Sequence, residues 1–281
     1  MNNILQDFIK DNNIKYYAVA NDNGDSVFLF LMPYAPFIFP TDVYEIDSYY
    51  LISNDTYHRE NKLINNLNKG ICEDYDLNFN CIFYEHNWFN GYNDFSALFA
   101  RRHNARNLRI LAAFSGLGKI ADNGFLYNSD YGTYNFIGSV VLPQDFPTIE
   151  FSLPDTKVKC LHCAACSVAC PTNAVETDKW NCLRSLQECA HIGLSNTQQL
   201  YAKKLNNRLL GCNNCQKFCP INSNITAISP PVDFLELIKK ENFDNALSNG
   251  NFKPLAEYIG ANYARSGKLK PIVDLINKTA K

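Results

Sequence analysis

Nine of the 11 cysteines in this 281-residue chain lie between Cys160 and Cys219, and seven of these nine form two groups of fixed spacing. The first group has the pattern C-x2-C-x2-C-x3-C-P, and the second has C-x2-C-x3-C-P. Thiolates at this spacing wrap around one corner of a four-iron cubane, and the proline directs the last cysteine to a neighbouring cluster. The two groups therefore predict two [4Fe-4S] clusters in a ferredoxin-like module.

The count of cysteines limits the choice of ligands, because two cubanes need eight thiolates. The groups provide seven, so the eighth must be Cys182 or Cys189, which both lie between them. In the ferredoxin arrangement the last cysteine of each group crosses to the other cluster. The predicted sets are Cys160, Cys163, Cys166 and Cys219 for one cluster, and Cys170, Cys212, Cys215 and the intervening cysteine for the other.

Zinc is the alternative ion, since C-x2-C pairs also build tetrahedral zinc sites. Two C-P endings and a run of three cysteines at C-x2-C-x2-C fit zinc poorly. Iron–sulfur clusters are therefore the favoured interpretation.

Composition indicates a soluble, cytoplasmic protein. A hydrophobic content of 46% and a charged content of 19% exclude a disordered or fibrous chain. Because the cysteines are confined to one region, a small disulfide-stapled protein is also excluded, and reduced, metal-binding thiols are typical of the cytosol. The N-terminal residues lack the apolar stretch of a secretory signal. The most apolar segment, 26–40, is shorter than the ~20 residues that a membrane helix needs.

The two halves of the chain differ in charge. Residues 1–150 carry 10 Lys/Arg against 18 Asp/Glu, whereas residues 151–281 carry 16 against 10. The basic half could face an acidic partner or nucleic acid. The plainer interpretation, which we favour, is that its positive charge surrounds thiolates and sulfides that are themselves negative.

Residue patterns predict alternating strands and helices before the cysteines and helices after them. Strand-like runs occupy 16–20, 27–31, 49–53, 81–84 and 134–142, and amphipathic patterns predict helices over 58–69 and 94–115. Beyond the paired prolines at 230–231 the pattern is helical, with Gly250 and Gly267 as expected breaks.

This order of elements predicts an α+β protein with three regions. They are an α/β domain for cofactor and substrate at 1–150, a double [4Fe-4S] ferredoxin-like domain at 151–229, and a C-terminal helical segment at 230–281.

Particular residues around the cysteines carry a resemblance to a known family. The sequences CPTNAV, Trp-Asn-Cys182 and RLLGCNNCQKFCPIN resemble the ferredoxin module of epoxyqueuosine reductases, which are cobalamin- and iron–sulfur-dependent enzymes of tRNA queuosine synthesis. Reductive dehalogenases are similar in plan. The resemblance covers most of the chain and is dense from 115 to 222. It implies a nitroreductase-like α/β domain and points to Cys182 as the eighth ligand.

The same resemblance implies a bound cobalamin, to which electrons would pass from an outer and then an inner cluster. Residues 115–123 look like the family's A-G-L-G-x-I-G-K-N segment. The implied cobalamin contacts are Gly116, Leu117, Gly118, Asn123 and Gly132. Taken alone, the glycines of this segment also fit an ordinary helix C-cap followed by a turn.

Candidate catalytic residues are less clearly marked, because the family's proton-donating aspartate has no counterpart here. Counting back from Gly116 places Arg102 near that position, whereas alignment on the strand at 81–84 places Glu85 or His86 there. Tyr57 and His58 match family positions near the start. We name Tyr57, His58 and Glu85 as the candidates. Four arginines between 101 and 109 predict either an anion-binding helix face or a solvated one.

The favoured function is a cobalamin-dependent reductase that receives electrons from a low-potential donor such as ferredoxin or flavodoxin. The alternatives are a dicluster electron-transfer protein that serves a partner reductase, and a structural or redox-sensing iron–sulfur protein. We expect tRNA to be a doubtful substrate, because the sequence ends after a short helical segment. The substrate and the oligomeric state do not follow from the sequence.

Overall fold

The computed structural model describes residues 2–22, 24–75, 82–83, 108–142, 146, 150–155 and 157–279. These residues form two compact units. The first contains Met1–Pro33 and Thr56–Cys160, and the second contains Tyr34–Asp55 and Leu161–Lys281. The predicted division places the first boundary near 150 and leaves 34–55 in the N-terminal domain. In the structure this early segment belongs with the cysteine-rich part of the chain, and the segment after 230 joins the same unit.

The first unit is built on an antiparallel sheet in the order β1-β2-β7-β4. Its strands are β1 (Tyr17–Asp22), β2 (Asp25–Pro33), β7 (Asn135–Leu142) and β4 (Ile82–Phe83). Leu29 of β2 lies opposite Ala18 of β1 and Ser139 of β7. The strands predicted at 16–20, 27–31 and 134–142 are therefore confirmed, and the described part of the strand predicted at 81–84 is β4.

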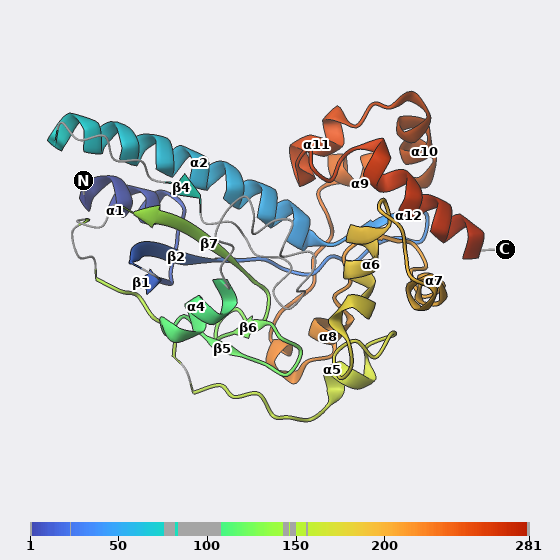
Figure 1. The fold of residues 1–281 in the computed structure, drawn as a ribbon, viewed down its shortest axis with the longest axis horizontal. Helices are drawn as coiled ribbons and strands as arrows, with labels where there is room; N and C mark the ends of the chain where they lie inside the picture. Colours follow the sequence, from blue (N-terminus) through green and yellow to red (C-terminus); the bar gives the residue numbers. More distant parts are fainter. Residues whose placement is uncertain are drawn as a thin grey trace. The chain divides into compact units, whose positions relative to one another are not determined.

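Alternating residues of β2 supply two apolar faces, because successive side chains of a strand point to opposite sides. On one face Phe28 and Phe30 contact Phe8 of helix α1 (Asn2–Asp11), with ring centroids 6.5 and 5.4 Å apart. On the other face Leu29 packs in a cluster with Ala112 of helix α4 (Leu108–Phe114). Figure 1 shows α1 and α4 on opposite sides of this sheet.

Helix α2 (Ser48–Tyr75) corrects one expectation and confirms another. The strand-like run at 49–53 forms its first turns, while the helix predicted at 58–69 lies further along it. The backbone N–H of Tyr49 donates to Oδ1 of Asp47 at 2.9 Å, which is the hydrogen bond of an N-terminal cap. This cap starts a helix where apolar composition alone predicts a strand.

A small hairpin completes the described part of the first unit. Strands β5 (Lys119–Ile120) and β6 (Leu126–Tyr127) pair antiparallel after α4. Of the long helix predicted over 94–115, the structure describes α4; residues 94–107 lie outside the described residues.

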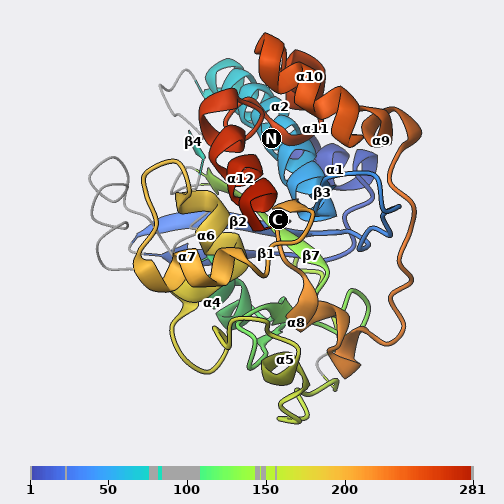
Figure 2. The same ribbon diagram turned by 90° about the vertical axis from the view of Figure 1, so that its right-hand side faces the viewer.

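The second unit packs helices around a two-stranded parallel pair, β3 (Glu45–Ile46) with β8 (Arg208–Leu210). In the cysteine region its helices are α5 (Ala165–Val168), α6 (Leu183–Cys189), α7 (Asn196–Ala202) and α8 (Asn214–Lys217), with 3-10 turns η1 (Lys179–Asn181) and η2 (Pro220–Asn222). Buried Tyr50, Leu186, Leu209 and Phe234 share one apolar core. Figure 2 shows α6 and α7 beside α12 (Ser266–Thr279).

The C-terminal residues of this unit are helical as predicted, although one break differs. The other three helices here are α9 (Val232–Ile238), α10 (Lys240–Asn249) and α11 (Lys253–Ile259). Gly250 ends α10 with a φ of +68°, a conformation that glycine adopts without strain. Gly267, expected to break a helix, lies instead in the first turn of α12, where a glycine costs less than in the middle of a helix. No helix in the described ranges combines the length and apolarity needed to cross a bilayer.

Candidate iron–sulfur cluster site

The first cysteine group lies on a loop with unusual backbone geometry. His162 and Ala164, on either side of Cys163, have φ values of 51° and 58°. L-residues other than glycine are uncommon in this left-handed region, so two of them on either side of one cysteine point to a functional constraint on the loop. Both residues lie within the cysteine motif whose spacing predicts that it wraps one corner of a cubane.

The second cysteine group is held at its start by Gln187 of α6. The side chain of Gln187 accepts from the backbone N–H of Gly211 at 2.7 Å and donates to the carbonyl of Arg208 at 3.0 Å. Gly211 has a φ of +90°, and a Cβ there would lie 2.4 Å from Cβ of Asp47. Only glycine fits this position, which directly precedes Cys212. Gln187 was missed by sequence reasoning, because an isolated glutamine in a helix carries no signal.

Cys182 lies at the N-cap of α6, and the surrounding groups act on its thiol in opposite directions. Burial raises the pKa of Cys182, whereas the backbone N–H groups of Arg184 and Ser185 and the positive charge of Arg184 act to lower it. Hydrogen bonds and a positive charge at the sulfur favour its anionic form, which is the form that binds metal.

Cys170 receives similar support from the loop that follows it. The backbone N–H of Ala174 donates to Sγ of Cys170 at 3.2 Å, and the hydroxyl of Thr172 lies 3.6 Å from the same sulfur. Burial acts to raise the pKa of Cys170, but the hydrogen bonds from Thr172, Val175 and Ala174 together lower it below its ordinary value.

The thiols of the set that contains Cys170 influence one another. Burial, followed by the charge of Cys182, raises the pKa of Cys212 to about 12. Burial and then the charges of Cys182, Cys212, Cys170 and Cys166 raise the pKa of Cys215 well above its ordinary value. Mutual interaction of this kind requires short separations. The groups that act on Cys212 and Cys215 thus include the other predicted ligands of this set, and four-thiolate ligation by the set stays a prediction.

Cys189 has a different environment. It is 4% exposed, and burial followed by the charge of Glu188 raises its pKa to about 11. The charged groups that affect Cys189 are Glu188 and Lys268, whereas those that affect Cys182 include Cys170.

The other predicted ligand set has members in both units. Cys163 is exposed and Cys166 is buried, both in the second unit. Cys160 belongs to the first unit, where its backbone N–H donates to the hydroxyl of Tyr127 at 2.9 Å.

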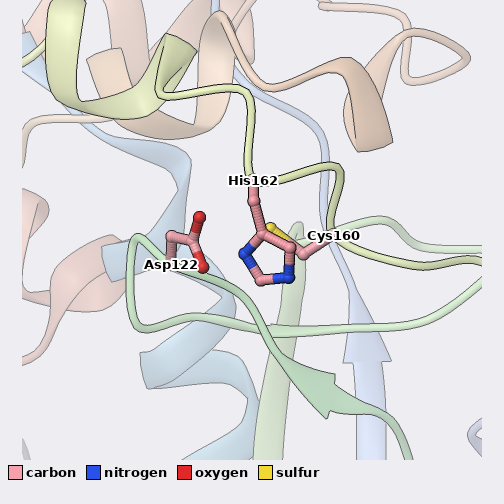
Figure 3. Close-up of side chains that lie close together, drawn as sticks. All are labelled: Asp122, Cys160 and His162. Atoms are coloured by element: carbon pink, nitrogen blue, oxygen red, sulfur yellow. The ribbon is translucent and has the colours of Figure 1, made fainter.

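Asp122 is a further polar residue near Cys160 that sequence reasoning missed. Both residues lie in the first unit, and a carboxylate oxygen of Asp122 lies within 4.8 Å of Sγ of Cys160. Figure 3 shows these two side chains with His162, which follows Cys160 by two residues. Since Cys160 is a predicted cluster ligand, we assign no separate metal ion to this group.

The candidate catalytic residues are placed only in part. Tyr57 and His58 lie on α2, and both side chains are exposed, with 48% of Tyr57 accessible to solvent. Their ring centroids are 5.8 Å apart. Glu85 lies outside the described residues, as do Arg101, Arg102 and Arg106. Arg109 donates from Nη1 to the carbonyl of Gly124 at 2.6 Å, so it helps to shape the turn after β5.

The residues implied to contact cobalamin all shape the first unit itself. Gly116 has a φ of +83°, and the N–H of Leu117 donates to the carbonyl of Ala112 at 3.0 Å, which ends α4 as a C-cap. A Cβ on Gly118 would lie 2.4 Å from the carbonyl oxygen of Tyr127. The close backbone approach expected at Gly118 is therefore made to β6.

The remaining two cobalamin candidates stabilise turns. Oδ1 of Asn123 accepts from the backbone N–H of Phe125 at 3.1 Å, and the carbonyl of Gly132 accepts from the N–H of Asn128 at 3.2 Å. Contacts within the first unit therefore explain the conformations of all five residues, and no bound ligand is needed to explain them. The described residues do not by themselves form a corrin site. Contact of these residues with cobalamin stays a prediction.

Comparison with known proteins first defines the class of the cysteine region. Residues 159–222 match the family described as a 4Fe-4S double cluster binding domain. The chain therefore contains a domain of the kind that binds two [4Fe-4S] clusters, as the cysteine spacing predicts.

Curated relatives named epoxyqueuosine reductase are similar to this chain over part of their length. The protein from Staphylococcus aureus is 32% identical over 122 residues, which are 42% of this chain and 30% of the relative. The protein from Vibrio cholerae is 26% identical over 161 residues, which are 56% of this chain and 40% of the relative. Each alignment thus spans less than half of the relative's length.

Solved structures of epoxyqueuosine reductases share the fold. The structure from Streptococcus thermophilus has a TM-score of 0.57 at 17% identity and covers 99% of this chain, which matches 80% of that structure. The structure from Bacillus subtilis has a TM-score of 0.59 at 16% identity, with coverage of 98% and 80%. The predicted α+β fold and the predicted resemblance to epoxyqueuosine reductases are both confirmed.

Proposed function

We propose that this protein is an iron–sulfur oxidoreductase of the epoxyqueuosine reductase type, in which electrons pass through two [4Fe-4S] clusters to a cobalamin and then to a substrate. The observation that carries the proposal is the match of residues 159–222 to a 4Fe-4S double cluster binding domain. The similarity in sequence and fold to epoxyqueuosine reductases supports the reductase part.

Each cluster has its own proposed ligands. Cys170, Cys182, Cys212 and Cys215 would hold one cluster, and Cys160, Cys163, Cys166 and Cys219 would hold the other. The choice of Cys182 over Cys189 is supported by the interaction of Cys182 with Cys170 and of Cys212 with Cys182.

When bound, the clusters supply one-electron carriers whose potential depends on charge, hydrogen bonds to sulfur and exposure to solvent. The protein contributes each of these factors. Backbone N–H groups of Ala174 and Arg184 act on the sulfurs of Cys170 and Cys182. Donors of this kind stabilise negative charge on the ligands and so favour reduction of a cluster.

The proposed cobalamin and the proposed reaction partners rest on the resemblance to epoxyqueuosine reductases alone. Since the residues implied to bind cobalamin also shape the first unit, no step is assigned to them. A solved epoxyqueuosine reductase contains a tRNA-Tyr epoxyqueuosine-modified stem loop, which makes tRNA a candidate substrate here. The candidate electron donors are ferredoxin and flavodoxin, and the proposed location is the cytoplasm.

Analysis of the anaerobically purified protein tests the iron–sulfur part. We expect about eight iron and eight sulfide per chain, and an electron spin resonance signal of reduced [4Fe-4S] clusters. A colourless protein that holds two zinc ions would contradict the proposal. Addition of cobalamin should give a corrin absorption band that changes on reduction.

An electron-transfer protein without its own cobalamin is the second candidate. Two observations favour this candidate. The side chains of Tyr57 and His58 are exposed, so they do not line a buried reaction site. Gly116 and Gly118 have conformations explained by packing within the first unit. This candidate predicts two low-potential clusters, no corrin binding, and complex formation with another reductase. Corrin binding with reduction of the cobalt would exclude it.

A further inference from the structure

Asp122 lies at the tip of the hairpin that β5 and β6 form. The backbone N–H of Gly124 donates to the carbonyl of Ala121 at 2.8 Å, and the N–H of Ala121 donates to the carbonyl of Phe125 at 2.9 Å. The first of these hydrogen bonds closes a β-turn in which Asp122 is the first corner residue. Nη1 of Arg109 also donates to the carbonyl of Gly124 at 2.6 Å. The backbone that carries the Asp122 carboxylate is therefore fixed.

Cys160 is anchored to the same hairpin. Its backbone N–H donates to the hydroxyl of Tyr127 at 2.9 Å. Tyr127 is buried in β6, where it pairs with Lys119 of β5. All of these residues belong to the first unit. One small element thus positions both the Asp122 side chain and a cysteine that the spacing predicts to bind a cluster.

The two side chains lie about as far apart as two ligands of one metal ion. A carboxylate oxygen of Asp122 lies within 4.8 Å of Sγ of Cys160. At zinc, sulfur and carboxylate oxygen lie about 2.3 and 2.0–2.2 Å from the ion, so two such ligands are at most about 4.5 Å apart. Figure 3 shows both side chains; His162, drawn with them, belongs to the second unit. An iron bound to Sγ of Cys160 is therefore within reach of the carboxylate after a small rotation of Asp122.

The chemistry of iron allows both ligands. Thiolates hold the iron of [4Fe-4S] clusters, and carboxylates bind iron in other protein sites. Cys160 falls within the residues that match a double-cluster domain. The Asp122 side chain is exposed, so no protein contact has to bury it before it binds a metal.

We propose that Asp122 is a second ligand for the iron that Cys160 binds, so that this corner of the cluster is held by either a thiolate or a carboxylate. The exchange breaks one iron–sulfur bond and forms one iron–oxygen bond. Both ligands are anions, so no electron is transferred. The inference rests on the proposed ligand sets and deepens them by adding a residue from outside the cysteine motifs. Its consequence is that this iron is retained when its bond to Cys160 is lost.

Removal of the thiolate tests the inference in the full-length, cluster-loaded protein. We expect Cys160→Ala to keep about eight iron per chain. Its electron spin resonance signal after reduction should differ from that of the wild type, because oxygen replaces sulfur at one iron. Cys160→Ala combined with Asp122→Asn should lose at least this iron and show the signal of a three-iron cluster.

A second exposed carboxylate of the first unit provides the matched control. Asp155 lies five residues before Cys160 and pairs with Lys157 at 3.3 Å. Cys160→Ala combined with Asp155→Asn should hold as much iron as Cys160→Ala alone. Equal iron content in Cys160→Ala with and without Asp122→Asn would overturn the inference, because a ligand from solvent would then explain the result.

A measurement that keeps Cys160 remains decisive if Cys160→Ala fails to fold. Oxidation of the loaded protein with ferricyanide removes iron from an exposed cluster corner, and electron spin resonance follows the three-iron product. Asp122→Asn should form this product at least about tenfold faster, since loss of a group that supports a metal site weakens metal binding by that order. Asp155→Asn should match the wild type. Equal rates in Asp122→Asn and wild type would overturn the inference, whereas a wild-type protein with fewer than two clusters would instead contradict the proposed function.

Discussion

At the scale of single residues, the cysteines differ more in their surroundings than in their spacing. Cys182 lies where backbone N–H groups and other thiols converge, whereas Cys189 packs beside Glu188. Both side chains are at least partly buried, so burial alone does not distinguish a cysteine that binds a cluster from one that does not. The groups around each sulfur support the proposal that Cys182 is the ligand, because a ligand needs other ligands nearby and donors that stabilise its charge.

Substitution of these two cysteines tests the ligand assignment. We expect Cys182→Ser to retain about half of the iron and sulfide, since a cubane that loses one of four thiolates is lost or weakened. Cys189→Ser serves as the matched control and should retain both clusters. Measurement of iron, sulfide and protein in the same sample checks the expectation. Loss of a cluster from Cys189→Ser, with Cys182→Ser unaffected, would reverse the assignment.

The buried ion pair between Glu188 and Lys268 is a second feature of this scale. Their side chains are 8% and 12% exposed, and Glu188 also accepts from the hydroxyl of Tyr50. Lys268→Met should lower the free energy of unfolding by about 3–5 kcal/mol, because it leaves a carboxylate buried without its cation. Urea titration followed by circular dichroism measures this change. In the exposed pair with Asp274, Lys270→Met should cost less than about 1 kcal/mol.

At the scale of elements, one glycine governs the approach of the turn after α4 to strand β6. A Cβ on Gly118 would lie 2.4 Å from the carbonyl oxygen of Tyr127 and 3.0 Å from a side-chain carbon of Leu126. Since the closer atom belongs to the backbone, it cannot rotate away. The hairpin of β5 and β6 therefore depends on this position.

Replacement of this glycine by alanine tests the packing. We expect Gly118→Ala to destabilise the first unit by about 1–3 kcal/mol, the usual cost of overpacking in a core. Gly267→Ala is the control, because a Cβ at Gly267 meets nothing within 4 Å and alanine is the better helix former. Thermal unfolding of both variants should give shifts of opposite sign. An unchanged transition in Gly118→Ala would show that the hairpin can adjust.

At the scale of the whole molecule, chain order and spatial grouping do not coincide. The segment 34–55 precedes most of the first unit in sequence, yet it belongs with the cysteine-rich second unit. Its strand β3 pairs with β8, which directly precedes the second cysteine group. The apolar core of the second unit therefore includes residues from the start, middle and end of the chain.

Buried tyrosines make the second unit sensitive to alkali. Burial is the main cause that raises the pKa of Tyr44 to about 12 and places the pKa values of Tyr34, Tyr50 and Tyr263 well above the ordinary value of 10. A group whose pKa is higher in the folded state contributes stability that is complete below its unfolded pKa. That stability is lost as the pH rises through the folded pKa.

We therefore expect the free energy of unfolding of the second unit to fall between about pH 10 and pH 12. Urea titrations at several pH values measure this slope, and absorbance at 295 nm reports tyrosine ionisation. Tyr44→Phe removes one contributing group and should give a shallower decline. A stability that is constant up to pH 12 would contradict the expectation.

How much the sequence predicts depends on the range of the interactions involved. The strands at 27–31 and 134–142 and the helices after 232 are visible in local patterns, because burial on one or both faces imposes a period on the residues. The run at 49–53 is predicted wrongly, since its conformation depends on the helix cap made by Asp47. Gln187 and Asp122 escape notice, because their partners lie distant in sequence.

By itself the sequence determined that the chain contains a double-cluster domain, since the cysteines, their spacing and the prolines after them are all encoded within short segments. It also determined the likeness to epoxyqueuosine reductases. Only the tertiary structure decided which groups surround each sulfur, where segment 34–55 packs, and why Gly118 and Gly211 must be glycine. The physical reason is range: spacing along the chain follows from covalent geometry, whereas charge, burial and steric contact depend on residues that meet only when the chain folds.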